Sequence, residues 1–312
     1  MLSISSILRL LFCDVCDIIV LYLSRLECDF NIMVKAIFVD MDGTLLGKSQ
    51  VAVSQRNMAA LEAALDKGVY VIPCTGRVYD MLPPQILTHR GIRYFVTSHG
   101  ARVYDRERDI MIYEELTPAE QAAKLMELLE GKGLYNEVAA NGTIYLEKAV
   151  ADHLDLSLVP SHHHWYIQDG CYTAVEKPSA YFRENNICIE KMNLYNIPEN
   201  LQREVFEAVT ATGFIRPTRF DISDALEFSG QNLEKARAME ALLNVLGIGY
   251  EDCLAIGDSA TDRDAIQACG IGVAMGNASE DVKAVANYIT ATNDQDGFAE
   301  AIEKFVLREE SL

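Results

Sequence analysis

Two carboxylates stand at the end of an apolar run early in the chain, in the sequence Asp40-Met-Asp42-Gly-Thr. The preceding residues, 36–39, are apolar and rich in β-prone side chains, which predicts a fully buried parallel strand. Charge is costly at such a place, and ligands of open α/β sheets bind at the carboxyl ends of the strands. The pattern therefore suggests an active site at Asp40 and Asp42.

Three other interpretations apply to this stretch. An Asp-Gly pair between apolar residues is a common hairpin turn, and taken alone the stretch fits a turn as well as a site. A phosphate-binding P-loop needs four residues between its glycines, whereas Gly43 and Gly47 enclose three. A calcium loop starting at Asp40 would need Gly and Glu where the chain has Leu45 and Val51. Only the turn and the active site remain open.

A second apolar run, 253–256, leads into Asp258 and Asp262, and a third, 69–72, leads to Thr75. If these strands are parallel, their carboxyl ends share one sheet edge. Like charges about 4 Å apart cost roughly 4 kcal/mol at an effective dielectric constant of 20, so several carboxylates there need a cation. Mg²⁺ fits because it prefers oxygen ligands and is usually held by one or two carboxylates together with substrate phosphate. The cluster therefore points to phosphoryl transfer.

The elements that must position these side chains follow a strand–helix–strand pattern, which predicts an α/β fold with a doubly wound parallel sheet. Ser54 is a good helix N-cap, and Gly68 and Gly247 fit helix ends. Strands are expected at 36–39, 69–72, 94–97, 253–256, 271–274 and 288–290. Helices are expected at 55–67, about 79–90, 235–246, up to about 268, 279–286 and from 298. On the helix that begins at Lys235, the expected buried face is Ala238, Leu242, Val245 and Leu246.

The pattern changes between residues 114 and 222, which are expected to form a separate α+β unit. Thr117-Pro-Ala-Glu120 resembles a capping box that opens a helix to about residue 130. Short strands at 142–146 and 187–193 and a helix near 199–212 follow. The remaining domain, the core, then comprises residues 33–113 and 223–312.

Composition limits the class of protein. A chain of 312 residues should form about two domains, and a formal charge of -19 argues against a nucleic-acid partner. Residues 1–32 are expected to be an N-terminal extension; charged residues interrupt them, so they do not fit a membrane span, and they lack clear signal-peptide features. The lone pair Cys13-x-x-Cys16 does not favour a zinc or redox site. A cytoplasmic protein acting on a small molecule fits best.

Four motifs in this order resemble those of the haloacid dehalogenase superfamily of phosphatases, over residues 33 to about 308. They are Asp40-Met-Asp42-Gly-Thr44, Thr75-Gly-Arg77, Lys235 and Gly257-Asp258-x-x-x-Asp262. About 160 residues separate the second motif from the third, which is where the Cof-type (subfamily IIB) branch carries a large α/β cap. The resemblance implies a Rossmann-like core with an inserted cap, and hydrolysis of a small phosphomonoester such as a sugar phosphate or a phosphorylated cofactor.

The resemblance also implies roles for these residues. Asp40 attacks phosphorus and becomes an aspartyl-phosphate, while Asp42 protonates the leaving alcohol and then activates water. Phosphate contacts are implied for Asp42, Gly43, Thr75, Gly76 and Lys235. Mg²⁺ is implied at Asp40, the backbone carbonyl of Asp42, and Asp258, with Asp262, Thr261 and Arg77 in support. Thr261 and His99 stand where the family commonly has Asn.

Two other functions stay open at this stage: a phosphomutase of the phosphomannomutase type, and a non-catalytic phospholigand-binding protein. In this family the cap recognises the leaving group, but the sequence does not identify the ester. Candidate cap residues, from chemistry alone, are Lys177, Arg183 and the run from His162 to Trp165. That run could bind metal or substrate, but it is more typical of a solvated polar loop.

Overall fold

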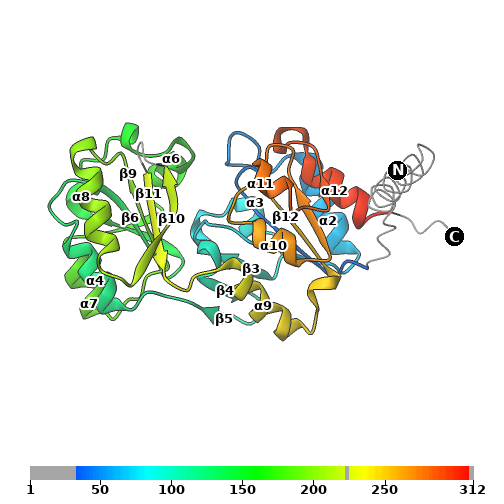
Figure 1. Ribbon diagram of the computed structural model, residues 1–312, viewed down its shortest axis with the longest axis horizontal. Helices are drawn as coiled ribbons and strands as arrows, with labels where there is room; N and C mark the ends of the chain where they lie inside the picture. Colours follow the sequence, from blue (N-terminus) through cyan, green and yellow to red (C-terminus); the bar gives the residue numbers. More distant parts are fainter. Residues whose placement is uncertain (1–32, 222–224, 309–312) are drawn as a thin grey trace, which may run out of the picture. The chain divides into compact units, whose positions relative to one another are not determined.

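The structure is a computed structural model that describes residues 33–221 and 225–308 (Figure 1). The described residues after Met33 belong to one compact unit, which contains a five-stranded, a six-stranded and a three-stranded sheet. The expectations for residues 1–32, including Cys13 and Cys16, lie outside the described residues. Within the described part of the chain, no helix is long and apolar enough to cross a membrane.

The core is a parallel five-stranded sheet in the order β14-β13-β12-β1-β2. Its strands are β1 (Ala36–Val39), β2 (Tyr70–Pro73), β12 (Cys253–Gly257), β13 (Ile271–Ala274) and β14 (Tyr288–Ile289). The central strand β1 is buried throughout, as a parallel strand covered on both faces must be. Val39 pairs with Pro73 on one side and Ile256 on the other, so the carboxyl ends of three strands are aligned. The predicted doubly wound parallel sheet is confirmed.

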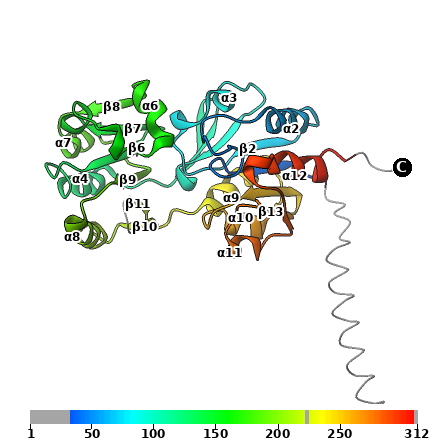
Figure 2. The same cartoon turned by 90° about the horizontal axis from the view of Figure 1, so that it is seen from above.

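Helices cover this sheet, with α9, α10 and α11 lying away from α2 and α3 (Figure 2). The helices of this part are α2 (Gln55–Asp66), α3 (Pro84–Leu87), α9 (Lys235–Leu246), α10 (Arg263–Ala268), α11 (Glu280–Lys283) and α12 (Gly297–Phe305). Ser54 caps α2 as predicted, because its side chain accepts a hydrogen bond from the Asn57 N–H. Gly247 ends α9 in the left-handed conformation, with φ 65°.

Two predictions about these helices are wrong. The helix expected over 79–90 is a 3₁₀ turn, Tyr79–Met81, followed by the short α3. Pro83 explains the break, since the residue before a proline is driven out of the helical region, and Leu82 is extended. On α9, Val245 is 54% exposed and Leu243 is buried in its place.

The strand predicted at 94–97 exists as β3 (Tyr94–Thr97), but it belongs to a different sheet. It pairs antiparallel with β4 (Arg102–Asp105), which pairs with β5 (Ile110–Glu114). A single parallel bridge between Cys74 and Val96 joins this sheet to the end of β2. That bridge brings the residues after β3 beside Thr75.

The six-stranded mixed sheet has the order β10-β11-β9-β6-β7-β8. Its strands are β6 (Tyr135–Ala140), β7 (Thr143–Glu147), β8 (Tyr172–Val175), β9 (Lys191–Tyr195), β10 (Ile215–Asp221) and β11 (Ala225–Gly230). The accompanying helices are α4 (Ala119–Glu127), α5 (Lys148–Ala151), α6 (His164–Gln168), α7 (Pro178–Glu184) and α8 (Glu199–Thr210). One face of the sheet packs through residues such as Val138, Met192 and Phe228 against α4, α7 and α8. We call this sheet with its helices the cap.

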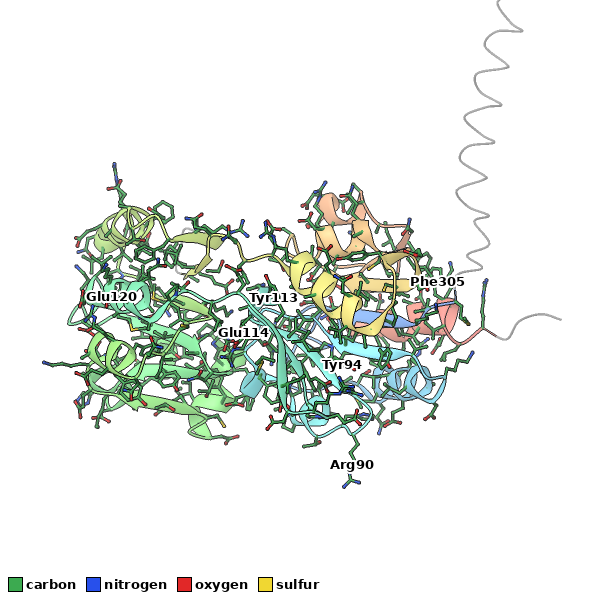
Figure 3. All side chains as sticks on the ribbon, turned by 90° about the horizontal axis from the view of Figure 1, so that it is seen from below. Arg90, Tyr94, Tyr113, Glu114, Glu120 and Phe305 are labelled. Atoms are coloured by element: carbon green, nitrogen blue, oxygen red, sulfur yellow. The ribbon has the colours of Figure 1, made fainter. Side chains whose placement is uncertain are left out.

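Several details of the cap differ from expectation. β11 pairs with β9 and β10, so the sheet continues beyond residue 222, where the core was expected to resume. The capping box does not form: Pro118 occupies the cap position, and the Thr117 backbone bonds to Ile189 instead. Glu120 lies at the surface of α4 (Figure 3) and pairs with Arg183. The domain limits given from the sequence stay a prediction.

We predict that Ser54→Ala lowers the free energy of unfolding by about 1 kcal/mol. The change removes the cap of α2 and the 2.6 Å hydrogen bond that the Ser54 hydroxyl donates to Asp296. Chemical denaturation followed by circular dichroism measures the difference. An unchanged midpoint and slope would show that the cap does not stabilise the fold.

Candidate active site

Asp40 follows β1 directly and lies at the aligned carboxyl ends of the core strands. The loop after it turns at Gly43, whose φ is 75°. A Cβ atom on Gly43 would lie 2.3 Å from Asp258 Oδ2, so both the backbone conformation and the space require glycine. The Thr44 hydroxyl donates to Asp258 Oδ1 over 2.9 Å. The Asp-Gly pair is thus a turn that also brings the β1 loop against the β12 loop.

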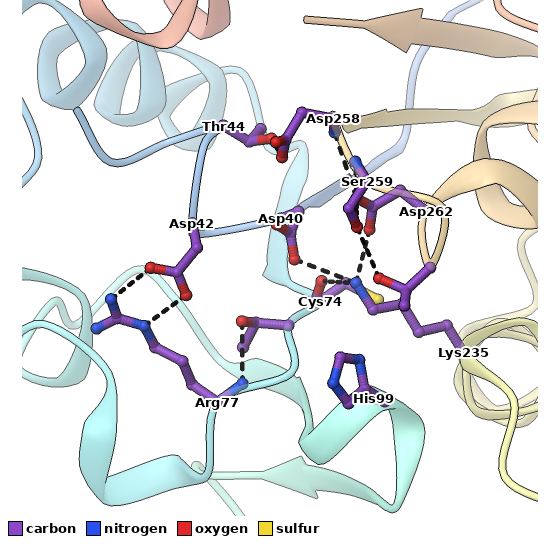
Figure 4. A network of polar contacts seen from close by, with 12 residues as sticks. Asp40, Asp42, Thr44, Cys74, Arg77, His99, Lys235, Asp258, Ser259 and Asp262 are labelled. Carbon is purple, nitrogen blue, oxygen red and sulfur yellow. Dashed lines mark hydrogen bonds and ion pairs between the residues drawn. The ribbon is translucent and has the colours of Figure 1, made fainter. Parts of the chain in front are cut away.

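Three carboxylates meet at this edge: oxygens of Asp40, Asp258 and Asp262 lie within 4.8 Å of one another (Figure 4). Burial, followed by the charge of Asp262, raises the pKa of Asp40 well above its usual value. The same two causes raise the pKa of Asp258 to about 6. Asp40 and Asp258 thus resist ionisation beside the other carboxylates of the cluster. A cluster of carboxylate oxygens fits a hard cation such as Mg²⁺.

Lys235 supplies the positive charge within this cluster. Its Nζ lies 3.1 Å from Asp40 Oδ1 and 2.6 Å from Asp262 Oδ1, and it donates to the Cys74 carbonyl over 3.1 Å. Burial alone would lower the pKa of Lys235, but Asp262 and Asp40 raise it well above its usual value. Lys235 therefore stays protonated although its side chain is only 4% exposed. It is the first residue of α9, which delivers it to the sheet edge.

Asp262 shapes the loop after β12 as well as binding Lys235. Its Oδ2 accepts from the Ser259 N–H over 3.0 Å, from the Ser259 hydroxyl over 2.9 Å and from the Asp258 N–H over 3.3 Å. Thr261, which stands where the family commonly has Asn, shares a 2.8 Å hydrogen bond with Ser259. Asp262 thus orients the loop that carries Asp258.

Asp42 points away from the three-carboxylate cluster and pairs with Arg77. Arg77 Nε donates to Asp42 Oδ2 over 2.8 Å and Nη2 donates to Oδ1 over 2.5 Å. The guanidinium also donates to the Met81 carbonyl over 3.0 Å and the Gln50 carbonyl over 2.7 Å. Its side chain is 4% exposed, whereas that of Asp42 is 34% exposed. Arg77 is therefore a buried cation that fixes the orientation of the more accessible Asp42 carboxylate.

Thr75 and Gly76 lie between these groups. Thr75 is buried, and its hydroxyl accepts from the Arg77 N–H over 3.2 Å. A Cβ atom on Gly76 would lie 2.4 Å from the His99 ring, so glycine permits the close approach of His99. His99 Nε2 lies 2.7 Å from Glu227 Oε1, on β11 of the cap. The structure therefore brings together the residues of all four predicted motifs and adds His99 to their edge.

Some residues near the site were not identified from the sequence. Asn277 donates to the Gly43 carbonyl over 2.8 Å and approaches Asp258 Oδ2 at 3.5 Å. Its position shortly after β13, at the same sheet edge, is the signal that could have found it. Glu227 could not be found in this way, because the residues from 223 were assigned to the core.

The cap residues suggested from the sequence lie in different surroundings. His163 is buried and lies 3.0 Å from Glu137, so at this residue the expected solvated loop is not found. The reason is that Glu137, a buried residue of β6, needs hydrogen-bond donors such as the His163 ring. Arg183 pairs with Glu120 and Glu127 on α4. Lys177 is exposed and precedes α7.

Comparison with known proteins finds similar chains over most of this sequence. The family model for haloacid dehalogenase-like hydrolases matches residues 37–302. The phosphatase YwpJ of Bacillus subtilis (strain 168) is 31% identical over 284 residues, which covers 85% of this chain and 97% of that protein. The 5-amino-6-(5-phospho-D-ribitylamino)uracil phosphatase YcsE of the same strain is 29% identical, over 89% of this chain and 98% of that protein.

A solved structure extends the comparison to the fold. The subclass IIB sugar phosphatase BT4131 matches with a TM-score of 0.70 over 88% of this chain and all of that chain. The two are 24% identical, and the likeness concerns the fold, including the separate sheet of the cap.

We predict that Mg²⁺ stabilises the protein more at pH 7 than at pH 5. The pKa of Asp258, raised to about 6, exceeds its unfolded value near 3.8, so without a cation the free energy of unfolding falls as pH rises between these values. A cation bound to the ionised cluster opposes that loss, since a ligand of the native state raises its stability.

Thermal unfolding with Mg²⁺ or with chelator, at both pH values, tests this expectation. Asp258→Asn should remove most of the gain at pH 7, while Asp264→Asn, at an exposed position on α10, should keep it. Equal gains at the two pH values would contradict the assignment of the cluster.

Proposed function

The chain belongs to the haloacid dehalogenase-like hydrolase family, and on that premise we propose that it is a Mg²⁺-dependent phosphatase of small phosphomonoesters that works through an aspartyl-phosphate. The observation that carries the proposal is the separation of two neighbouring carboxylates. Asp40 lies in the cluster with Lys235, while Asp42, two residues on, is held apart by Arg77. Figure 4 shows both carboxylates on the same side of the loop.

In the first half of the reaction, a carboxylate oxygen of Asp40 forms a bond to phosphorus as the bond from phosphorus to the ester oxygen breaks. Lys235 binds Asp40 Oδ1, which leaves Oδ2 as the oxygen to attack. The departing oxygen takes a proton from Asp42 and leaves as an alcohol. Asp40 is then an aspartyl-phosphate and Asp42 a carboxylate.

In the second half, Asp42 takes a proton from a water molecule as that water attacks phosphorus. The bond between phosphorus and Asp40 breaks, and inorganic phosphate leaves. Both carboxyl groups thereby return to their starting states. Because Arg77 binds both oxygens of Asp42, the carboxylate keeps one orientation between the two proton transfers.

The phosphoryl group needs positive charge and hydrogen-bond donors around it. Lys235 and the Thr75 hydroxyl lie at the same edge and supply both, with the backbone at Gly43 and Gly76 close by. Asp40, Asp258 and the Asp42 carbonyl would hold Mg²⁺. When bound, the ion neutralises the carboxylates and the charge that develops on the phosphoryl oxygens.

The proposed substrate class rests on the substrates for which similar proteins are named. One relative is named for a ribityl phosphate ester and the solved structure for sugar phosphates, which suggests small phosphorylated metabolites for this chain too. Suitable substrates for a screen are therefore sugar phosphates, polyol phosphates and phosphorylated cofactors.

We predict that Asp40→Asn lowers kcat for p-nitrophenyl phosphate by at least about 10³-fold, because the amide cannot serve as the nucleophile. Phosphate release in Mg²⁺, with a chelator arm that should also abolish it, measures the effect. Asp264→Asn is the matched control and should keep wild-type activity. Full activity in Asp40→Asn would exclude the aspartyl-phosphate mechanism, and dependence on a bisphosphorylated activator would indicate a mutase.

We further predict that Arg77→Lys lowers kcat roughly 10- to 100-fold and changes its pH profile, because a lysine cannot bind both oxygens of Asp42 and two carbonyls at once. Arg93→Lys is the control, since the Arg93 guanidinium also donates hydrogen bonds to both oxygens of one carboxylate, that of Asp105, away from the site. The two variants should lose comparable stability, but only Arg77→Lys should alter the pH profile of kcat. Matching profiles would show that Arg77 acts on the fold alone.

A further inference from the structure

Three consecutive residues between β3 and β4 adopt positive φ angles: Ser98 at 51°, His99 at 58° and Gly100 at 95°. Glycine adopts this region freely, but serine and histidine are uncommon there, because the Cβ atom crowds the backbone. Two such residues in succession therefore need contacts that hold them in this conformation. We call residues 98–100 the strained turn.

The backbone of the strained turn supports the second motif. The Ser98 N–H donates to the Arg77 carbonyl over 2.8 Å. The His99 N–H donates to the Thr75 carbonyl over 2.9 Å, and the His99 ring lies against Gly76. The positions of the Thr75 and Arg77 backbones thus depend on the conformation of the turn.

Gly100 brings the strained turn against the first residue of α9. A Cβ atom on Gly100 would lie 2.9 Å from the Glu234 carbonyl oxygen and 3.0 Å from Lys235 Cα, so a larger residue would displace the turn or the start of the helix. Lys235 carries the ammonium group that binds Asp40. The turn therefore contacts the backbone of two residues proposed to bind the phosphoryl group, Thr75 and Lys235.

Carboxylates of the cap bind both side chains of the strained turn. The Ser98 hydroxyl donates to Glu190 Oε2. His99 Nε2 lies 2.7 Å from Glu227 Oε1. Glu190 directly precedes β9, and Glu227 lies on β11, which pairs with β9. Two neighbouring strands of the cap sheet thus hold one turn of the core.

Glu190 is a buried charge, only 1% exposed. Its Oε1 accepts from the Gly142 N–H over 2.7 Å and lies 3.2 Å from Nε of Arg102, a residue of β4. A buried carboxylate is costly unless hydrogen-bond donors and a cation compensate it. Loss of the Ser98 hydroxyl would therefore take a donor from a buried charge and also remove a bond that holds the turn.

The strained turn lies where precise geometry has the largest effect on rate. Strained backbone persists only where the surrounding structure holds it, and it is concentrated at active sites. Here the cap holds the turn, and the turn supports Thr75 and Lys235. A displacement of about 1 Å in groups that position a substrate can lower the rate roughly 100-fold. A small relaxation of the turn would thus be enough to impair phosphoryl transfer.

We propose that Ser98 and Glu190 are positioning residues of the phosphoryl-transfer site: through the strained turn, the cap sets the positions of Thr75 and Lys235. The proposal rests on the phosphatase function, because it assigns to the turn an effect on the binding of the phosphoryl group. It makes the cap necessary for the chemical step, apart from any contact between the cap and the leaving group.

The first variant is Ser98→Ala, which removes the hydroxyl and keeps a Cβ atom at positive φ. With p-nitrophenyl phosphate in Mg²⁺, kcat/KM should fall at least about ten-fold. The inhibition constant Ki of orthovanadate, which mimics five-coordinate phosphorus, should rise by a similar factor. A loss of stability alone would lower the folded fraction, seen as a lower Tm, and leave KM and Ki unchanged.

Ser98→Gly separates the strain of the turn from the chemistry of the hydroxyl. This variant also lacks the bond to Glu190, but glycine adopts positive φ without a steric cost, so the turn keeps its conformation. Its kcat/KM and its Ki for orthovanadate should therefore lie within about three-fold of the wild-type values. Equal losses in Ser98→Gly and Ser98→Ala would overturn the role of the strained turn.

Glu190→Gln tests the contribution of the cap, because its NH₂ group cannot accept the hydrogen bond that a carboxylate oxygen accepted. Combined with Ser98→Ala it should lower kcat/KM no further than the more damaging single change, since both act through one bond. Multiplied effects would show that the two residues act independently and would overturn the proposal. Asp105→Asn is the matched control: Asp105 is also 1% exposed and paired with an arginine, so it should lower Tm but leave kcat/KM and Ki unchanged.

The outcomes separate this proposal from the phosphatase function. No hydrolysis by the wild-type protein would overturn both. Hydrolysis by the wild-type protein, with unchanged kcat/KM and Ki in Ser98→Ala, would overturn the positioning role alone. A fall of kcat/KM in Ser98→Ala with an unchanged Ki would also overturn it, because the groups that bind the phosphoryl group would then be correctly placed.

Discussion

The structure depends on how negative charge is held at one buried sheet edge. Asp40, Asp258 and Asp262 converge there, and one ammonium group, Lys235, lies between two of them. Removing the lysine would leave Asp40 and Asp262 buried without their positive counter-charge, which costs far more than an unpaired charge at the surface does. Burial and the charge of Asp262 raise the pKa of Asp258. This repulsion between carboxylates favours binding of a cation at the edge. In the proposed function, the same excess of negative charge that destabilises the edge on its own is what would draw a metal ion to it.

This constraint explains the layout of the chain. Lys235 must start a helix beside the edge, so the chain has to return to the core immediately before α9. The cap is therefore inserted between Thr75 and Lys235, and its last strand, β11, ends at Gly230, five residues before the lysine. Glu227 on that strand reaches His99, which lies against Gly76. The candidate site and the cap are thus joined through the contact between Glu227 and His99.

The residues of the site could be predicted because each follows a strongly apolar strand or opens a helix. Strands β1 and β12 are recognisable from composition alone, and Asp40 and Asp258 are the residues that directly follow them in the chain. What the sequence did not reveal depends on contacts between residues that are distant in the chain. β11 is a strand of the cap only because β9 and β10 flank it, and His163 is buried only because Glu137 lies beneath it. Pro83 is the exception, a local signal that should have ended the helix expected over 79–90.

The same distinction applies to the face of the cap sheet that points away from α4 and α8. Polar residues at every second position, as in Lys191-Met-Asn193, are present in the sequence, but alternation alone says only that two faces differ. Register decides that Asn193 lies between Glu137 and Glu227, and a shift by one residue would turn all of these side chains toward α4 and α8.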